Sequence, residues 1–274
     1  MRWVSLSLAA MLLAACSVDQ DVQIESRNIE LNETAQPASF NPNRAALDSV
    51  VRQSGPTYVT LVVSKQNDQG SNAMRDADRG VAVTSGSGFV VEPSGYVLTA
   101  AHVAVAKGNK VSARAANGRI YSGTVIDVIP NKDMALIKLQ NFRGKPALPS
   151  GNACVPRGTV VFSLGKPHSQ GDTARVGEVE AMHFGRPVQY GQFGYPDAMV
   201  LRMNTQKGES GGPLFNEQGQ LVGMVVSTLA AADGTPLNLA HAVPATSLAG
   251  FLCTHVSCSG NWSTLAREST EGCS

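Results

Sequence analysis

The feature that most constrains the fold is a series of short strand-like segments along the 274-residue chain. These segments are rich in Val, Ile and Thr and are separated by Gly, Pro, Asn and Asp, which is typical of strands joined by turns. Six segments precede the stretch 143–156 and six follow it. They cover 58–64, 81–91, 96–99, 110–115, 120–129 and 134–139, and then 159–164, 174–184, 198–204, 212–215, 221–228 and 238–243.

Many short strands in two groups predict an all-β protein with two similar halves, built as barrels or sandwiches. Helical patterns are confined to 44–53 and 245–253. The chain is 43% hydrophobic and 16% charged, which excludes a wholly disordered protein. A net charge of +1 lacks the electrostatic signature of a nucleic-acid-binding protein. Its apolar runs are shorter than the roughly 18 residues that a membrane-spanning helix needs.

The N-terminus has the pattern of an export signal. Arg2 precedes a short apolar stretch, 4–15, which ends in Leu-Ala-Ala and is followed by Cys16. This stretch resembles the lipobox of bacterial lipoproteins, which implies cleavage before Cys16 and lipid attachment to that residue. By the same resemblance, Ser17 implies the periplasmic face of the outer membrane. The alternative is an ordinary signal with a chance cysteine.

An acidic segment follows the expected signal peptide of residues 1–15. Residues 17–43 carry five acidic residues and one basic residue, a net charge of −4, with little apolar periodicity. We interpret 16–43 as a flexible tether, with a docked extension as the alternative. A folded domain over 44–258 and a C-terminal tail over 259–274 complete the expected organisation.

The other four cysteines are Cys154, Cys253, Cys258 and Cys273. An even number in an exported protein predicts two disulfides, and three pairings are open. A zinc site is the alternative because Cys253 and Cys258 flank His255, but the spacing matches no common ligand pattern.

Three motifs carry candidate chemistry. Thr-Ala-Ala-His ends at His102 after one strand, Asp133 starts another, and Ser210 lies within Gly-Glu-Ser-Gly-Gly-Pro. The order His, Asp, Ser is that of chymotrypsin-type proteases and not of subtilisins or α/β-hydrolases. Together with segments 86–91, 221–223 and 242–244, these motifs make residues 45–253 resemble the trypsin-like serine proteases, and among them the bacterial HtrA/DegP type.

The resemblance implies two six-stranded antiparallel β-barrels, at about 56–142 and 157–245, with the site between them and a short C-terminal helix at about 245–253. Ser210 would be the nucleophile, His102 the general base and then acid, and Asp133 the residue that orients the imidazole. The N–H groups of Gly208 and Ser210 would form the oxyanion hole. No metal or cofactor is expected.

The resemblance also assigns substrate-binding residues. Asn204, six residues before the serine, would lie at the base of the primary pocket and make it neutral, which suits uncharged side chains of small or medium size. The strand Val226-Ser227-Thr228 would pair with the substrate backbone. Ala240 and His241 would line the pocket, and His241 leaves a Glu or Gln preference open.

The sequence departs from the family in two places. Glu209 stands before the serine, where these proteases commonly have Asp or Asn, and its partner is left open between Lys207, Arg175 and solvent. The residues after Cys253 are too few for the PDZ domain that usually follows an HtrA protease. The resemblance favours the disulfide Cys154–Cys253, which leaves Cys258 to pair with Cys273.

We therefore expect a serine endopeptidase that hydrolyses exported polypeptides through an acyl-enzyme. It would be held at the membrane by its lipid and would act in envelope quality control or on one dedicated partner. The alternative is a binding or scaffold protein on a protease fold, either inactive or active only under some conditions. A lipase or esterase is disfavoured by the order of the three motifs.

Overall fold

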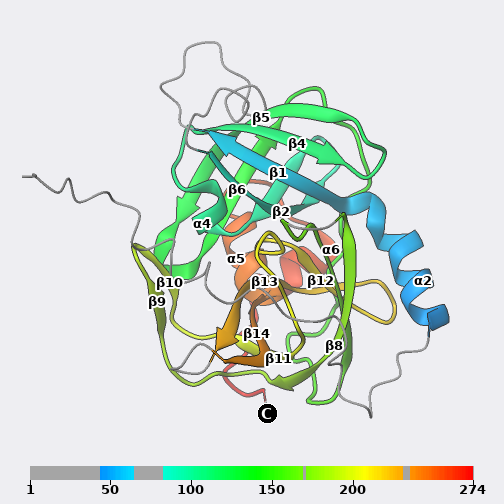
Figure 1. Ribbon diagram of the computed structural model, residues 1–274, viewed down its shortest axis with the longest axis vertical. Coiled ribbons are helices and arrows are strands. Elements are labelled where there is room, and N and C mark those ends of the chain that lie inside the picture. The colour runs from blue at the N-terminus through cyan, green and yellow to red at the C-terminus, as the bar shows by residue number, and fades with distance from the viewer. Residues whose placement is uncertain (1–43, 65–82, 169–170, 231–234, 274) are drawn as a thin grey trace, which may run out of the picture.

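The structure is a computed structural model that describes residues 44–64, 83–168, 171–230 and 235–273. The predicted signal peptide, the lipid attachment at Cys16 and the tether at 16–43 lie outside these residues. Two closed antiparallel barrels of six strands each form the body of the molecule (Figure 1). The prediction of two six-stranded β-barrels is therefore confirmed.

The first barrel has the strand order β1-β2-β3-β6-β5-β4. Alternating apolar side chains fill its interior, as in β1, where Val59, Leu61 and Val63 are buried. The elements in this part of the chain are α2 (Arg44–Ser54), η1 (Gly55–Thr57), β1 (Tyr58–Ser64), β2 (Val83–Glu92), β3 (Tyr96–Thr99), α4 (Ala101–Ala104), β4 (Lys110–Ala115), β5 (Ile120–Ile129), η2 (Pro130–Lys132) and β6 (Met134–Leu139).

The second barrel has the strand order β11-β14-β13-β12-β7-β8. Strand β2 of the first barrel packs against β7 and β12, so the two barrels meet along this strand. The elements are β7 (Val160–Gly165), β8 (Thr173–Ala181), β11 (Met199–Arg202), β12 (Pro213–Asn216), β13 (Leu221–Ala230) and β14 (Pro236–Pro244).

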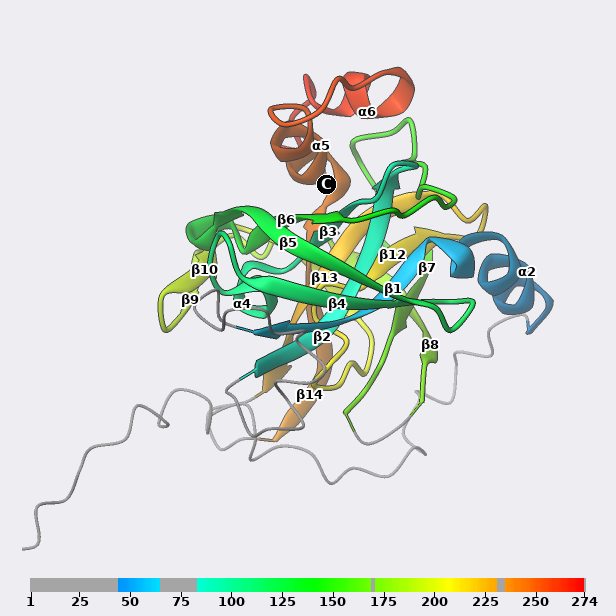
Figure 2. The same cartoon turned by 90° about the horizontal axis from the view of Figure 1, so that it is seen from above.

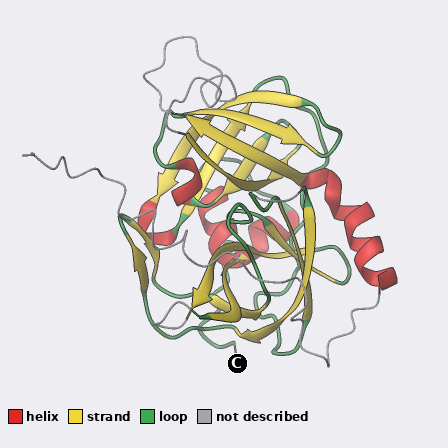
Figure 3. Cartoon of the chain, in the orientation of Figure 1, coloured by secondary structure: helices red, strands yellow, loops and turns green. Residues whose placement is uncertain are grey.

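Besides α2 and the short helical turns, a hairpin and two more helices lie outside the barrels, and the sequence patterns predicted only one of these two helices. The hairpin of β9 (Val188–Tyr190) and β10 (Phe193–Tyr195) forms a separate two-stranded sheet. Helices α5 (Ala245–Leu252) and α6 (Gly260–Leu265) pack together beyond the barrels (Figure 2). Figure 3 shows how little of the described chain is helical. None of the described helices has the length and apolar character needed to cross a bilayer.

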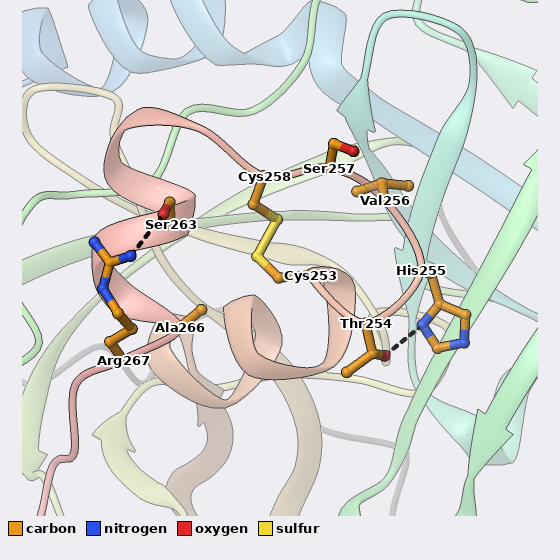
Figure 4. A pocket seen from close by; sticks show the side chains of 9 residues that line it. All are labelled: Cys253, Thr254, His255, Val256, Ser257, Cys258, Ser263, Ala266 and Arg267. Carbon is orange, nitrogen blue, oxygen red and sulfur yellow. Dashed lines mark hydrogen bonds between the residues drawn. A yellow bond between two sulfur atoms is a disulfide. The ribbon is translucent and has the colours of Figure 1, made fainter.

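The disulfide pairing differs from the expected one. Cys154 is bonded to Cys273, and Cys253 to Cys258, whereas the sequence analysis favoured Cys154–Cys253 and Cys258–Cys273. Cys253 caps α5, and the chain turns back at once, so that its Cα lies 5.3 Å from the Cα of Cys258 (Figure 4). This local turn satisfies Cys253 without a partner from the other end of the domain.

The C-terminal residues pack against the second barrel. The His183 ring is bonded to the Thr270 carbonyl at 2.7 Å, and Cys273 is buried in the core of the second barrel beside Val155 and Met182. This docking brings Cys273 to the segment that connects the barrels, where Cys154 lies.

We expect the variant Cys154→Ser to be markedly less stable than the wild type. The Cys154–Cys273 disulfide spans 119 residues of chain. Closing so long a loop in the unfolded state is worth about 5 kcal/mol in the chain-entropy account. Denaturant unfolding measures the loss, and mass spectrometry of a non-reduced digest identifies the linked peptides.

The matched control is the double variant Cys253→Ser/Cys258→Ser. This disulfide spans only five residues, for which the same account gives about 2 kcal/mol. Equal losses in the two variants, or a digest that links Cys253 to Cys154, would contradict the pairing described.

Candidate active site

His102 stands on α4, the single helical turn that directly follows β3. Small buried residues, Ala100, Ala101 and Ala104, allow this turn to pack closely against the barrel. The imidazole side chain keeps 16% of its surface exposed. His102 is therefore held by a buried backbone while its ring can still be reached.

Asp133 occupies the position between η2 and β6 and has a left-handed backbone, with φ 46° and ψ 45°. Aspartate tolerates this region because its short polar side chain can bond locally. The residue is fully buried. Its carboxylate accepts hydrogen bonds from the backbone N–H of His102 at 3.0 Å and from its ring Nδ1–H at 2.9 Å. Because a carboxylate only accepts, the ring proton lies on Nδ1, and Nε2 is left as the basic nitrogen.

Ser210 lies in the turn between β11 and β12. Its hydroxyl donates to the carbonyl of Val226 at 3.4 Å. The neighbouring Gly211 has φ 82°, and a Cβ on it would lie 2.3 Å from Thr99 Oγ1, so only glycine fits. Thr99 ends the strand before α4, and the Ser210 turn therefore packs against the segment that carries His102, although the two come from different barrels.

Ser87 on β2 ties this turn to the first barrel. It is fully buried, and its N–H donates to the Ser210 carbonyl at 2.9 Å. Its hydroxyl donates to the Gly208 carbonyl at 2.8 Å. Its own carbonyl accepts from the Thr99 hydroxyl at 2.7 Å. One residue thus connects the serine turn with the end of β3.

Two backbone N–H groups near Gly208 have no acceptor in the described part of the chain. Gly208 has φ 98°, and a Cβ on it would lie 2.3 Å from the Lys166 carbonyl. The carbonyls on both sides of its N–H are engaged, that of Lys207 by the N–H of His168 at 3.0 Å and that of Gly208 by Ser87. The two N–H groups are those of Gly208 and Ser210, which donate no hydrogen bond to any of the described residues.

Glu209 is 2% exposed, and its partner is Arg175 on β8. The Arg175 Nε–H donates to one carboxylate oxygen at 2.9 Å, and the N–H of Gln206 donates to the other at 3.1 Å. Burial raises the pKa of Glu209, while Arg175 and the Gln206 N–H act in the opposite direction. Of the three possibilities left open by the sequence, the structure selects Arg175.

The expected substrate-binding residues lie on neighbouring strands. Ser227 pairs with His241, and Thr228 with Ala240, between β13 and β14. Ala240, His241 and Val226 are fully buried, while Asn204 is only half-buried. Beside them, the hydroxyls of Thr205 and Thr228 lie 2.6 Å apart.

His241 is the ionisable group of this cluster. The Tyr195 hydroxyl lies 2.7 Å from its Nδ1 and 2.6 Å from the Ser227 hydroxyl, and the Phe184 ring packs against it with centroids 4.4 Å apart. Its Nε2 is buried without a hydrogen-bond partner in the described part of the chain. Burial lowers the pKa of His241 to about 4. The imidazole is therefore neutral at neutral pH.

The sequence analysis missed the contribution of the β9–β10 hairpin. Tyr190 donates a hydrogen bond to Asp133, and Tyr195 contacts His241, so each end of the hairpin reaches one part of the site. The only signal was the alternation of aromatic residues with glycine in Tyr-Gly-Gln-Phe-Gly-Tyr, at 190–195. Three-residue strands are too short to show a reliable periodicity.

The Cys253–Cys258 disulfide, His255 and Arg267 line part of a hollow of about 540 Å³ (Figure 4). None of the expected catalytic residues lines it. The described residues hold no group of three or more His, Cys, Asp or Glu side chains placed to bind a metal ion.

Two six-stranded barrels, a buried Asp–His pair on one and a glycine-rich serine turn on the other, define the class of chymotrypsin-fold proteins. Residues 86–224 match the family model described as the trypsin-like peptidase domain. The chain belongs to this family.

Individual relatives agree with this assignment. The chain is 34% identical over 179 residues to the mitochondrial serine protease HTRA2 of Bos taurus, which covers 64% of this chain and 37% of the relative. It is 31% identical over 163 residues to a probable periplasmic serine endoprotease, DegP-like, of Buchnera aphidicola, with 58% and 34% covered. The chain thus spans little more than a third of these relatives. The active form of the Rv3671c protease of M. tuberculosis shares the fold, with a TM-score of 0.62 at 24% identity over 83% of this chain and 97% of that one.

We expect Arg175→Met to destabilise the protein and to abolish reaction at Ser210. The substitution leaves the buried Glu209 carboxylate without its counter-charge, which typically costs about 3–5 kcal/mol. The turn that Glu209 anchors then loses its shape. Denaturant unfolding measures the first effect, and labelling of Ser210 by a fluorophosphonate measures the second.

Two variants control this experiment. Arg175→Met/Glu209→Gln removes both charges and should regain most of the stability; a double variant as unstable as the single one would contradict the assignment. Arg202→Met removes a partly exposed arginine that pairs with Glu178 and Glu180, and should leave the stability almost unchanged because solvent screens exposed ion pairs.

We expect His241 to make the fold less stable in acid. In the unfolded chain a histidine has a pKa of about 6.5, whereas the folded value is about 4. Between these values only the unfolded state binds the proton, so the stability falls as the pH is lowered, by on the order of 3 kcal/mol in all. His241→Asn should remove this part of the pH dependence, measured by urea unfolding across the interval.

His183 supplies a control of opposite sign. Its ring contacts the Asp197 carboxylate and the Thr270 carbonyl, and both contacts raise its pKa. The contribution of His183 to the stability is therefore full below the pKa of the unfolded state. It is lost as the pH rises through the higher pKa of the folded state. His183→Asn should therefore weaken the protein more in acid than in alkali, and equal pH profiles for the two variants would contradict both assignments.

Proposed function

We propose that this protein is a serine endopeptidase in which Ser210 is the nucleophile, His102 the general base and acid, and Asp133 the orienting carboxylate. The observation that carries the proposal is the buried Asp133–His102 pair, whose helical turn lies against the Ser210 turn of the other barrel. A serine hydroxyl is a weak nucleophile until an adjacent base takes its proton.

The reaction follows from the protonation of His102. With Nδ1–H bonded to Asp133, Nε2 accepts the proton as Ser210 Oγ bonds to the scissile carbonyl carbon. The same nitrogen returns the proton to the leaving amine as the peptide bond breaks, which leaves an acyl-enzyme. Water then repeats both steps and releases the product. Asp133 stabilises the imidazolium formed in between without taking its proton.

The N–H groups of Gly208 and Ser210 would bind the oxyanion of each tetrahedral intermediate. Losing one such donor typically costs about 10²–10³ in rate. Arg175 supports this role because it fixes Glu209, the residue between the two donors. Because Arg175 supplies the counter-charge of Glu209 from within the domain, no charge released by cleavage of the chain is needed there. The turn can therefore form without zymogen activation.

The proposed substrates are polypeptides in extended conformation. Strand β12 pairs with β13 only as far as Met224, and residues 226–228 have no strand partner on that edge in the described part of the chain. A substrate backbone could add there as a further strand. Asn204, Ala240 and neutral His241 make an uncharged primary pocket, suited to small or medium uncharged side chains and to amide side chains.

We further propose that the protein acts on exported polypeptides in the cell envelope, held at the periplasmic face of the outer membrane by lipid on Cys16. The predicted export signal supports this location, as does the similarity to the probable periplasmic serine endoprotease of Buchnera aphidicola. Both quality control and a dedicated substrate fit this location.

One observation favours a second candidate, a binding protein that is catalytic only under some conditions. The Ser210 hydroxyl donates to Val226 in this structure, so it must rotate before its proton can pass to His102. Such misaligned contacts are common in proteases without substrate.

Labelling with a fluorophosphonate probe separates the two candidates. We expect the folded protein to be labelled and Ser210→Ala to be unlabelled, because only an activated serine attacks the phosphorus atom. Digestion of a peptide library, read by mass spectrometry, then identifies the residue before the cleaved bond, expected to be uncharged.

Folded protein that resists the probe, both alone and with added peptides, would favour the binding protein. Cleavage predominantly after Arg or Lys would contradict the neutral pocket.

A further inference from the structure

The β9–β10 hairpin reaches from the second barrel to the catalytic pair of the first. It lies between β8 and β11 in the chain, and β10 packs against η2, the turn that leads into Asp133. In both Figure 1 and Figure 2 the hairpin lies beside α4, which carries His102.

Tyr190, the last residue of β9, contacts both members of the pair. Its hydroxyl donates a hydrogen bond to Asp133 Oδ2, the oxygen nearer to the His102 ring nitrogen, and lies 3.5 Å from that nitrogen. Its ring meets the imidazole edge-on, with centroids 5.6 Å apart and planes at 79°. Phe193, across the hairpin, adds a second edge contact at 6.4 Å.

The Asp133 carboxylate depends on its donors because it is fully buried. Two of them belong to His102, its backbone N–H and its ring Nδ1–H. The third is the Tyr190 hydroxyl. A carboxylate can only accept a hydrogen bond, so the phenol is the donor. The Tyr190 hydroxyl therefore stabilises part of the negative charge of Asp133, which otherwise would interact with the imidazole alone.

We propose that Tyr190 is a positioning residue of the proposed peptidase, one that holds the Asp133 carboxylate and tunes its bond to His102. The inference rests on the proposed roles of Asp133 and His102. Its consequence is that removal of the hydroxyl strengthens the Asp133–imidazolium bond and raises the pKa of His102, while the imidazole becomes less well oriented.

Other titratable groups on the elements packed against α4 have partners of their own or are exposed. Asp127 pairs with His255, Glu92 accepts from Ser94, Lys138 donates to the Ser94 carbonyl, and Lys132 is exposed. On the hairpin itself, Tyr195 bonds to His241 rather than to the pair. Tyr190 is therefore the group whose removal should change the titration of His102.

The test is an NMR titration of the His102 ring in a Ser210→Ala background, with and without Tyr190→Phe. Phenylalanine keeps the ring contact and removes only the hydroxyl. We expect the pKa of His102 to rise by about half a unit to one unit in Tyr190→Phe. Tyr195→Phe, which removes the other hydroxyl of the hairpin, is the matched control and should leave this pKa unchanged. Unfolding curves establish that the variants are folded.

Kinetics with Ser210 restored supply the second readout. We expect Tyr190→Phe to lower kcat by about tenfold, the scale of one hydrogen bond to a charged group, with KM unchanged. An unshifted His102 titration overturns the proposal, and a change in KM alone assigns Tyr190 to substrate binding instead. The titration needs no turnover. If the wild-type protein cleaves no peptide, the proposed function is wrong, but the titration still tests whether Tyr190 acts on the Asp133–His102 pair.

Discussion

The site depends on one buried serine, Ser87, at the strand where the barrels meet. Its N–H, hydroxyl and carbonyl are bonded to Ser210, Gly208 and Thr99, respectively. These contacts join Thr99, the residue that leads into the histidine turn, to Gly208 and Ser210 in the serine turn. The relative position of the barrels and the shape of the serine turn are therefore set by the same hydrogen bonds, and a change in one must alter the other.

Two buried carboxylates give the site its charge, and they do different work. Glu209 is neutralised by Arg175 and holds the backbone of the serine turn. Asp133 has no arginine or lysine partner among the described residues; its charge is shared among neutral donors, His102 and Tyr190. A full counter-charge suits a structural anchor, whereas shared donors leave enough negative charge to stabilise an imidazolium.

The barrel strands could be predicted because each carries its own signal. The alternation in Tyr58–Ser64 and in Lys110–Ala115 places one face in the core whatever the rest of the chain does, and both strands have the predicted bounds. Helix α6 and the β9–β10 hairpin were not predicted, because they are short and their shape depends on the surfaces on which they pack. The predicted disulfide pairing was wrong because the resemblance suggested a long-range partner for Cys253, whereas a local turn brings Cys258 to it.

The sequence by itself determined the chemistry available to this protein. The order of His102, Asp133 and Ser210, and the glycines around the serine, are local patterns that a reader can recognise without a fold. Only the tertiary structure decided the partners: Arg175 for Glu209, 34 residues away, Tyr190 for Asp133, 57 residues away, and Cys273 for Cys154, 119 residues away. Such contacts depend on how two barrels and a hairpin pack, and packing is a property of the whole chain that no single segment records.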